Sequence, residues 1–144
     1  MRAIALIICL SSCDLLGPAP SLSHAAATSG CGPAGGPTIV ILLSHDPIRS
    51  VPPSFPYVSV TIWQPVTAAS LAGHTWSVDS TGAASAFYVT WPGRSQSGSS
   101  GSITITSVDS TNALAGVLDL QFPSRGVATQ FKASWIAYSG GYCN

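Results

Sequence analysis

The sequence predicts an all-β protein, an antiparallel β-sandwich or flattened barrel of about seven strands that ends in a meander. Composition is the first reason: charged residues make up only 7% of the 144 residues, and every carboxylate is Asp. The polar remainder is mostly Ser, Thr and Gly, a mixture that suits strands and turns and lacks the residues that helices prefer. The second reason is the alternation of apolar and polar residues along the last third of the chain.

The last third of the chain contains three alternating runs separated by short breaks that are rich in turn-forming residues. The runs are residues 102–108, 113–122 and 127–137. Closing the first turn places Ile105 opposite Gly116, and closing the second places Leu118 opposite Phe131. Both hairpins then bury the same face, which carries Leu114, Gly116, Leu118 and Leu120. A slip of one residue would expose all of these side chains, so the agreement of two turns supports an antiparallel meander.

Four further strands are expected upstream of the meander. Residues 38–44 form a near-continuous apolar run, typical of a central strand that is buried on both faces. Residues 57–64 alternate between apolar and polar side chains. Residues 75–78 and 84–91 are predicted to form a hairpin, and residues 92–101, rich in Gly and Ser, a flexible surface loop.

One six-residue sequence occurs twice, at 77–82 and 107–112, with five of the six residues identical. In both places it separates two predicted strands. The carboxylates of Asp79 and Asp109 can each bond the backbone just ahead of them, as in an Asx-turn. A calcium site needs several oxygen ligands, and each copy supplies one carboxylate. We therefore interpret the repeat as a turn and predict no metal and no cofactor.

The N-terminus has the features of a secretory signal, in which a positive residue precedes the apolar run Ala3–Leu10. Two cleavage sites compete. The sequence Leu10-Ser11-Ser12-Cys13 resembles a bacterial lipobox, in which Cys13 is acylated and becomes the new N-terminus. The alternative site, Ala25-Ala26-Ala27, would release a soluble secreted or periplasmic protein that begins at Thr28.

The lipobox interpretation divides the chain into a signal peptide (1–12), a lipidated N-terminus with a flexible tether (13–36) and a β-domain (37–144). Pro, Ser, Ala and Gly dominate the tether, as expected of a flexible spacer. The domain would then lie in the bacterial cell envelope, with the membrane as its partner through the lipid anchor. Formal net charge is zero, so there is no electrostatic argument for binding nucleic acid.

The four cysteines leave one candidate disulfide. Cys9 is removed with the signal peptide, and Cys13 is either lipidated or also removed. Cys31 and Cys143 remain, 112 positions apart and at opposite ends of the domain. A disulfide closing so long a loop stabilises by about 4–5 kcal/mol in the chain-entropy model. The alternative, a reactive or metal-binding thiol, has no partner residues nearby in the sequence.

Catalytic residues are sparse. His45 and Asp46 are adjacent, and Ser70 and His74 lie farther along, but neither a nucleophile-elbow motif nor a zinc-protease motif accompanies them. We therefore expect a non-enzymatic protein with a structural or interaction role, and keep a small secreted hydrolase as an alternative.

The second alternative is a carbohydrate-binding module. Four tryptophans are many for this length. Alternation places Trp91 and Trp135 on core faces. Trp63 lies on the more polar face of its strand and, with Tyr57 and Tyr88, could form a flat platform on which sugar rings stack. Otherwise this face is a second core face.

Three segments resemble the C-terminal part of certain small, uncharacterised bacterial lipoproteins known mainly from myxobacteria. The segments are Gly101–Val108, Gly116–Phe122 and Thr129–Ala133, and the late cysteine also fits. The pattern of those proteins is S-G-x-I-x-I-T, then G-x-F-x-x-x-F, then G-x-F-x-A. Leu118 departs from it where Phe is usual, as does Gln130 in place of the second Gly. The resemblance implies an envelope lipoprotein with a β-domain, and it implies no active site. Apart from the membrane, the expected class of partner is a glycan or an envelope protein.

Overall fold

The computed structural model describes residues 21–32, 35–63, 67–79 and 82–137, and these form an all-β fold. Nine strands and one short 3₁₀ helix follow one another, and this part of the chain contains no α-helix. The elements are β1 (His24–Cys31), β2 (Pro37–Ser44), β3 (Tyr57–Trp63), η1 (Ala68–Leu71), β4 (His74–Ser77), β5 (Ala84–Trp91), β6 (Arg94–Ser97), β7 (Ser100–Val108), β8 (Leu114–Phe122) and β9 (Arg125–Trp135).

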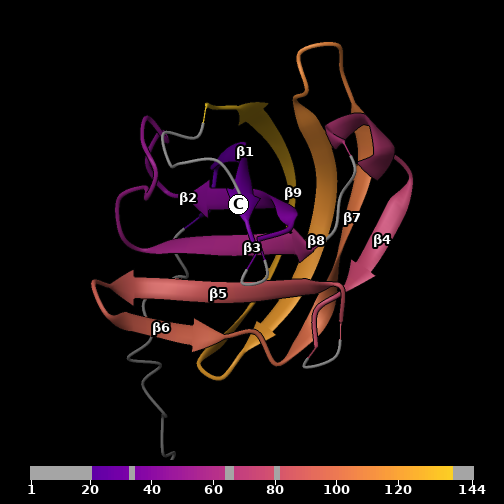
Figure 1. The fold of residues 1–144 in the computed structure, drawn as a ribbon. Coiled ribbons are helices and arrows are strands. Elements are labelled where there is room, and N and C mark those ends of the chain that lie inside the picture. Colours follow the sequence, from indigo (N-terminus) through magenta and orange to yellow (C-terminus); the bar gives the residue numbers. More distant parts are fainter. Residues whose placement is uncertain (1–20, 33–34, 64–66, 80–81, 138–144) are drawn as a thin grey trace, which may run out of the picture.

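All nine strands belong to one sheet, in the order β4-β7-β8-β9-β1-β2-β3-β5-β6. Neighbouring strands are antiparallel except β1 and β9, which are parallel. The sheet curls into a half-barrel, so that β2, β3, β5 and β6 cross the view of Figure 1 while β7, β8 and β9 run along its height. The expected sandwich of two antiparallel sheets is therefore corrected to one curled, mixed sheet, and the expected seven strands become nine.

The core lies on the concave side of the curl. Strand β3 shows how the alternation builds it: Val58, Val60 and Ile62 are fully buried, while Tyr57 and Trp63 on the other face are half-buried. Burying each such aliphatic side chain contributes about 1.5–3 kcal/mol. The same face of β8 carries Leu114, Leu118, Leu120 and Phe122. The predicted central strand is confirmed, because β2 is buried on both faces along most of its length.

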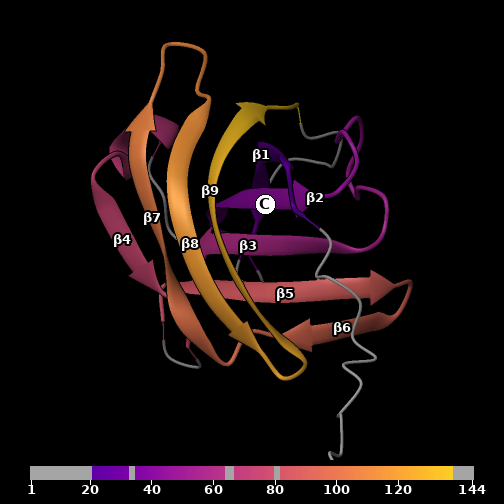
Figure 2. The ribbon, with the colours of Figure 1, turned by 180° about the vertical axis from the view of Figure 1, so that it is seen from behind.

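The C-terminal meander is confirmed as β7, β8 and β9 (Figure 2). Ile105 lies opposite Gly116 as predicted. In the second hairpin the predicted pairing is wrong by two positions, because Leu118 lies opposite Thr129 and Gly116 opposite Phe131. The turn occupies residues 123–124, which puts a proline where its fixed φ suits the first turn position. A shift of two preserves the faces, so the buried residues are those predicted.

Strand β6 was missed because its residues were predicted to be a flexible loop. Pro92 and Gly93 form a two-residue turn that places Arg94 opposite Trp91, and Gly93 adopts a φ of 73°. The predicted hairpin of residues 75–78 with 84–91 is also wrong. Strand β4 pairs with β7 and β5 pairs with β3, and one isolated bridge links Val78 to Ala84.

Strand β1 corrects the predicted tether. Residues 24–31 are not a spacer outside the domain but an interior strand, paired with β2 on one side and with β9 on the other. The composition of Ala, Ser, Thr and Gly suggested flexibility. Yet Ala27 is fully buried and Ala26 is 2% exposed, so small side chains are what this crowded position in the sheet accommodates. The domain therefore begins at or before His24, not at residue 37.

One edge of the curled sheet, formed by β5 and β6, meets the turn between β8 and β9. The Nη1 of Arg125 donates a hydrogen bond of 2.7 Å to the hydroxyl of Tyr88, and its guanidinium lies 5.0 Å from the centre of the Tyr88 ring. The same ring lies 5.9 Å from that of Phe122. Nearby, Oε1 of Gln96 accepts hydrogen bonds from the backbone N–H and the hydroxyl of Ser124. These contacts hold β5 and β6 against the β8–β9 hairpin.

Candidate ligand-binding surface

The structure does not bring the three predicted platform residues together. Tyr57 and Trp63 lie on the convex face of β3, but six residues apart, which is about 20 Å along a strand. Tyr88 lies on the opposite, concave face of the sheet and is only 6% exposed. The prediction that Tyr88 contributes to an exposed platform is therefore wrong. Side chains alternate between the two faces along β5, so Tyr88 lies on the same face as Ala84 and Ala86, which face the core.

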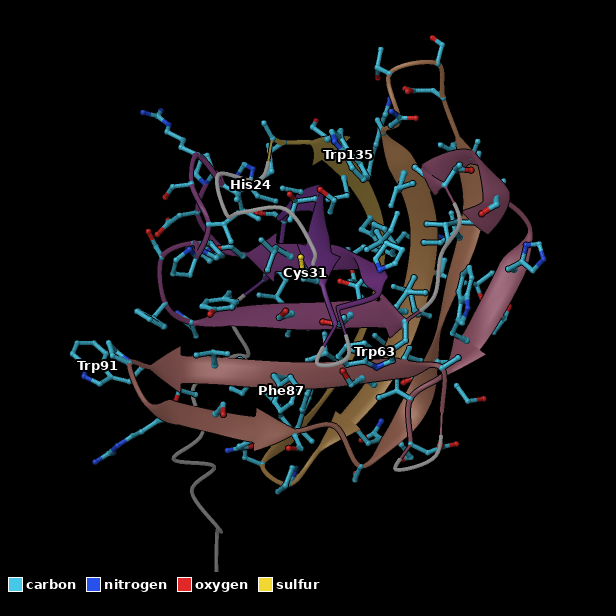
Figure 3. All side chains as sticks on the ribbon, in the orientation of Figure 1. His24, Cys31, Trp63, Phe87, Trp91 and Trp135 are labelled. Atoms are coloured by element: carbon cyan, nitrogen blue, oxygen red, sulfur yellow. The ribbon has the colours of Figure 1, made fainter. Side chains whose placement is uncertain are left out.

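The side chain of Trp63 packs against another segment of the fold. A Cβ added to Gly32 would lie 3.3 Å from the six-membered ring of Trp63, so the indole packs closely against the backbone of the loop that follows β1. The backbone N–H of Trp63 donates to the carbonyl of Ala83, at 2.8 Å. Figure 3 shows Trp63 at the opposite end of this part of the sheet from Trp91. Trp63 therefore fixes the β1–β2 loop rather than contributing to a platform with Tyr57.

A different set of aromatic side chains gathers on the convex face, the half-buried Phe55 and Tyr57 and the exposed Phe87 and Trp91, and we call it the aromatic patch. The Phe55 ring lies 5.5 Å from that of Tyr57 and 6.4 Å from that of Trp91. Trp91 is 65% exposed and Phe87 is 39% exposed. Both project from β5 in Figure 3, with Trp91 at the end of the strand. Partial burial raises the pKa of the Tyr57 phenol.

Polar side chains accompany the aromatic patch. Cross-strand partners share one face of a sheet. The partners of Phe87 are Ser59 on β3 and Ser97 on β6, and the partner of Trp91 is Arg94. The patch therefore combines broad aromatic faces with hydroxyl groups and one guanidinium, and these polar partners belong to β3 and β6, the two neighbours of β5.

The sequence prediction placed Trp91 in the core, and this is wrong. Alternation along β5 left two options, and the face with Phe87 and Trp91 looked more apolar than the face with Ala84 and Ala86. The concave side beside Ala84 and Ala86 is already filled by the branched side chains of β2 and β3, while the ring of Tyr88 packs farther along against Phe122. Phe87 and Trp91 are therefore left on the outside. Trp135 is half-buried and packs against the core cluster, in line with its predicted position.

The candidate hydrolase residues occupy separate places. His45 follows β2, and its Nδ1 lies 3.2 Å from the carbonyl oxygen of Ser21. His74 begins β4, its Nδ1 lies 3.1 Å from the Ala72 carbonyl, and its ring lies 5.9 Å from that of Trp76. The Ser70 hydroxyl donates to the carbonyl of Thr67, within η1 and its cap. The backbone N–H of Asp46 donates to the Ser44 hydroxyl. His45, Ser70 and His74 each have a separate partner, and no contact among the described residues joins the four candidates.

The Asx-turn prediction is confirmed at Asp109. Its Oδ1 accepts hydrogen bonds from the backbone N–H of Thr111 at 2.8 Å, from the Thr111 hydroxyl and from the backbone N–H of Ala113. The Thr111 hydroxyl and the two N–H groups lower the pKa of the Asp109 carboxyl. Asn112 takes the positive φ, at 62°. Among the residues that the structure describes, no three His, Cys, Asp or Glu side chains form a group that could hold a metal ion.

The lipidation site Cys13 and the disulfide partner Cys143 lie outside the described residues, so acylation and the pairing with Cys31 stay predictions. In the described part of the chain, no helix has the length and hydropathy needed to span a bilayer. No protein-family model, curated protein or solved structure matches the chain. The site must therefore be interpreted from its own geometry.

Proposed function

We propose that this protein is a non-enzymatic binding protein of the bacterial cell envelope, and that the aromatic patch binds carbohydrate. The observation that supports this most directly is the exposure of Trp91, at 65%, beside two further rings on a regular sheet surface. Large exposed apolar side chains that gather in one place mark interaction sites. Here they are held by β-strands, and a rigid scaffold lowers the entropy lost on binding.

Carbohydrate is the ligand class that suits both the aromatic rings of the patch and the polar side chains beside them. A pyranose ring presents an apolar C–H face that can lie on an aromatic ring, while its hydroxyl groups need hydrogen-bond partners at the edge. The patch offers the rings of Phe87 and Trp91 and, beside them, the side chains of Ser59, Ser97 and Arg94. Because the surface is convex, it suits an extended glycan chain better than a single enclosed sugar.

The same proposal retains the lipid anchor at Cys13 over cleavage after Ala27. The second cleavage would remove Ala25, Ala26 and Ala27, and these are the three residues through which β1 pairs with β9. The nine-stranded sheet would lose the connection between its two halves. If Cys13 is acylated instead, the whole of β1 is retained, and because Ser21, Leu22 and Ser23 already contact the domain, the tether shortens to residues 14–20, at most about 25 Å when fully extended.

A glycan array probed with the folded protein, followed by calorimetric titration of the best binder, tests the carbohydrate proposal. We expect Trp91→Ala and Phe87→Ala to weaken binding at least tenfold. Val117→Ala is the matched control, because Val117 on β8 has the same exposure as Phe87, 39%, and lies outside the patch. Absence of any binder, or binding that is equally weakened by the control, would contradict the proposal.

A further inference from the structure

A second candidate site lies where β1 and β9 separate. Strand β9 begins at Arg125, but its pairing with β1 covers only Ala133, Ser134 and Trp135. Two adjoining hollows of about 460 Å³ and about 380 Å³ occupy the space beside the unpaired half of β9. We call this space the β9 groove. Leu22 and Ser23 line one side of it, and residues 125–132 line the other.

The alternation of hydrogen bonds shows which backbone groups face the β9 groove. The turn closes with Phe122 opposite Arg125, so odd-numbered residues of β9 bond to β8 and even-numbered residues point the other way. The even-numbered Ile136 confirms this direction, because its N–H donates a hydrogen bond of 2.8 Å to the carbonyl of Ala27 on β1. Gly126, Ala128 and Gln130 therefore direct their N–H and C=O groups into the groove.

These backbone groups lack a strand partner among the described residues. The one hydrogen bond found there is local, from the hydroxyl of Thr129 to the carbonyl of Gln130 at 3.0 Å. Gly126 and Ala128 have small side chains, so another backbone can approach this edge closely. An unpaired strand edge with spaced donors and acceptors is the surface to which an extended polypeptide adds as a further strand.

We propose that the β9 groove binds an extended, acidic segment of a partner polypeptide, which adds to the sheet beside β9. Charge complementarity favours an acidic segment: among the described residues that line the groove, the charged ones are Lys132 and Arg125, both cations, and the Arg125 guanidinium keeps its positive charge while it is bonded to the neutral Tyr88 hydroxyl. The inward-facing lining residues Val127 and Phe131, with Leu22 opposite, favour apolar side chains at alternate positions of the segment.

The test uses the full chain and a defined probe, the N-acetylated and C-amidated heptapeptide Asp-Thr-Val-Ser-Val-Thr-Asp. Backbone amide exchange is followed by NMR with and without the peptide. We expect at least tenfold slower exchange of the Gly126, Ala128 and Gln130 amides when the peptide is present at millimolar concentration. A peptide that is N-methylated at every second residue keeps its side chains but loses its N–H donors, and it should give no protection.

Two variants at one position separate the backbone contact from the side-chain contact. Ala128→Pro removes an N–H that points into the groove. Proline is tolerated there, because this N–H does not bond the neighbouring strand β8. Ala128→Val keeps that N–H. We expect the proline variant to abolish peptide protection and the valine variant to retain it, with the far-ultraviolet circular dichroism of both unchanged.

Three outcomes would overturn the proposal. The first is no protection by the peptide, and the second is equal protection by a peptide with Lys in place of both Asp residues. The third is slow exchange of the three amides before any peptide is added, which would mean that the chain's own upstream residues occupy the groove.

Discussion

The guanidinium of Arg125, on the first residue of β9, is hydrogen-bonded to the hydroxyl of Tyr88 on β5 across the open side of the curled sheet. The two residues are 37 positions apart, and their strands are separated by β1, β2 and β3 in the order of the sheet. The pair therefore joins segments that no backbone hydrogen-bond ladder connects directly, and it fixes how tightly the half-barrel curls.

Removing the Tyr88 hydroxyl should loosen this closure. We expect Tyr88→Phe to lower the free energy of unfolding by about 1–2 kcal/mol, because it removes a hydrogen bond to a charged donor. Urea unfolding measures the change. Tyr57→Phe is the control, since the Tyr57 hydroxyl makes no hydrogen bond within the described residues. Equal losses in the two variants would show that the contact with Arg125 adds nothing to stability.

Gly116 should tolerate no side chain. An added Cβ would meet the carbonyl oxygen of Thr104 and would lie 2.9 Å from Cζ of Phe131. Gly116→Ala should therefore destabilise the protein by about 1–3 kcal/mol, as overpacking does elsewhere. Gly36→Ala is the matched control, because a Cβ there meets nothing within 4 Å. A thermal melt that ranks the two variants in the opposite order would contradict the close packing of Phe131 on Gly116.

The Asp109 turn predicts a dependence of stability on pH. Hydrogen bonds from Thr111 and Ala113 lower the pKa of the Asp109 carboxyl from its ordinary value of 3.8. The stabilisation is therefore complete above the unfolded pKa and is lost as the pH falls through the folded pKa. Asp109→Asn should flatten the fall in melting temperature as the pH is lowered from roughly 5 to roughly 2, a range that spans the ordinary pKa of an Asp carboxyl. Thr111→Val should raise the pKa of Asp109 in an NMR titration, and no change would contradict the hydrogen bonds.

Replacing Trp63 and replacing Trp91, the two tryptophans on the convex face, should have different effects on stability. Trp63 packs on Gly32, so Trp63→Ala should cost about 2 kcal/mol, less than the 3–5 kcal/mol typical of a fully buried ring. Trp91 is 65% exposed, and Trp91→Ala should change the free energy of unfolding by no more than about 0.5 kcal/mol. Chemical denaturation of both variants checks this, and a large loss for Trp91→Ala would mean that the aromatic patch is part of the core.

Removal of residues 1–27 should prevent folding. A chain that begins at Thr28 keeps the pairs of residues 28–31 with β2 but loses every pair between β1 and β9. We expect it to lack the cooperative melting transition of a chain that begins at Cys13. A stable Thr28 chain with native circular dichroism would remove the structural objection to cleavage after Ala27.

Strands with strong alternation could be predicted from the sequence, and strands without it could not. Val58, Val60 and Ile62 were placed correctly because period-two burial is a local property. Strand β6 is a polar edge strand, and strand β1 consists mostly of small residues, so neither has an apolar alternation to detect. The pairing of β4 with β7 is non-local, and nothing in the sequence of either strand specifies it.

The sequence predicted the type of candidate site, an aromatic surface, but not most of the residues that form it. Aromatic side chains on the outer face of this part of the sheet were expected, and the half-buried Tyr57 is among them. Trp91 and Phe55 were missed for a physical reason: which face of β5 is exposed depends on how much volume the neighbouring strands already fill, and Phe55 lies in a proline-rich loop without periodicity. The β9 groove depends on where two strands diverge, which is a tertiary property.

The parallel contact of β1 with β9 has a consequence for the time at which the protein can fold. The first strand of the sheet cannot find its second neighbour until the last strand has been synthesised, about a hundred residues later. Contacts between residues so distant in sequence form slowly, and the chain remains unfolded for longer while it emerges. If the chain is exported as proposed, threaded across a membrane in extended form, this delay is useful, because the sheet can be completed only after export has delivered its last strand.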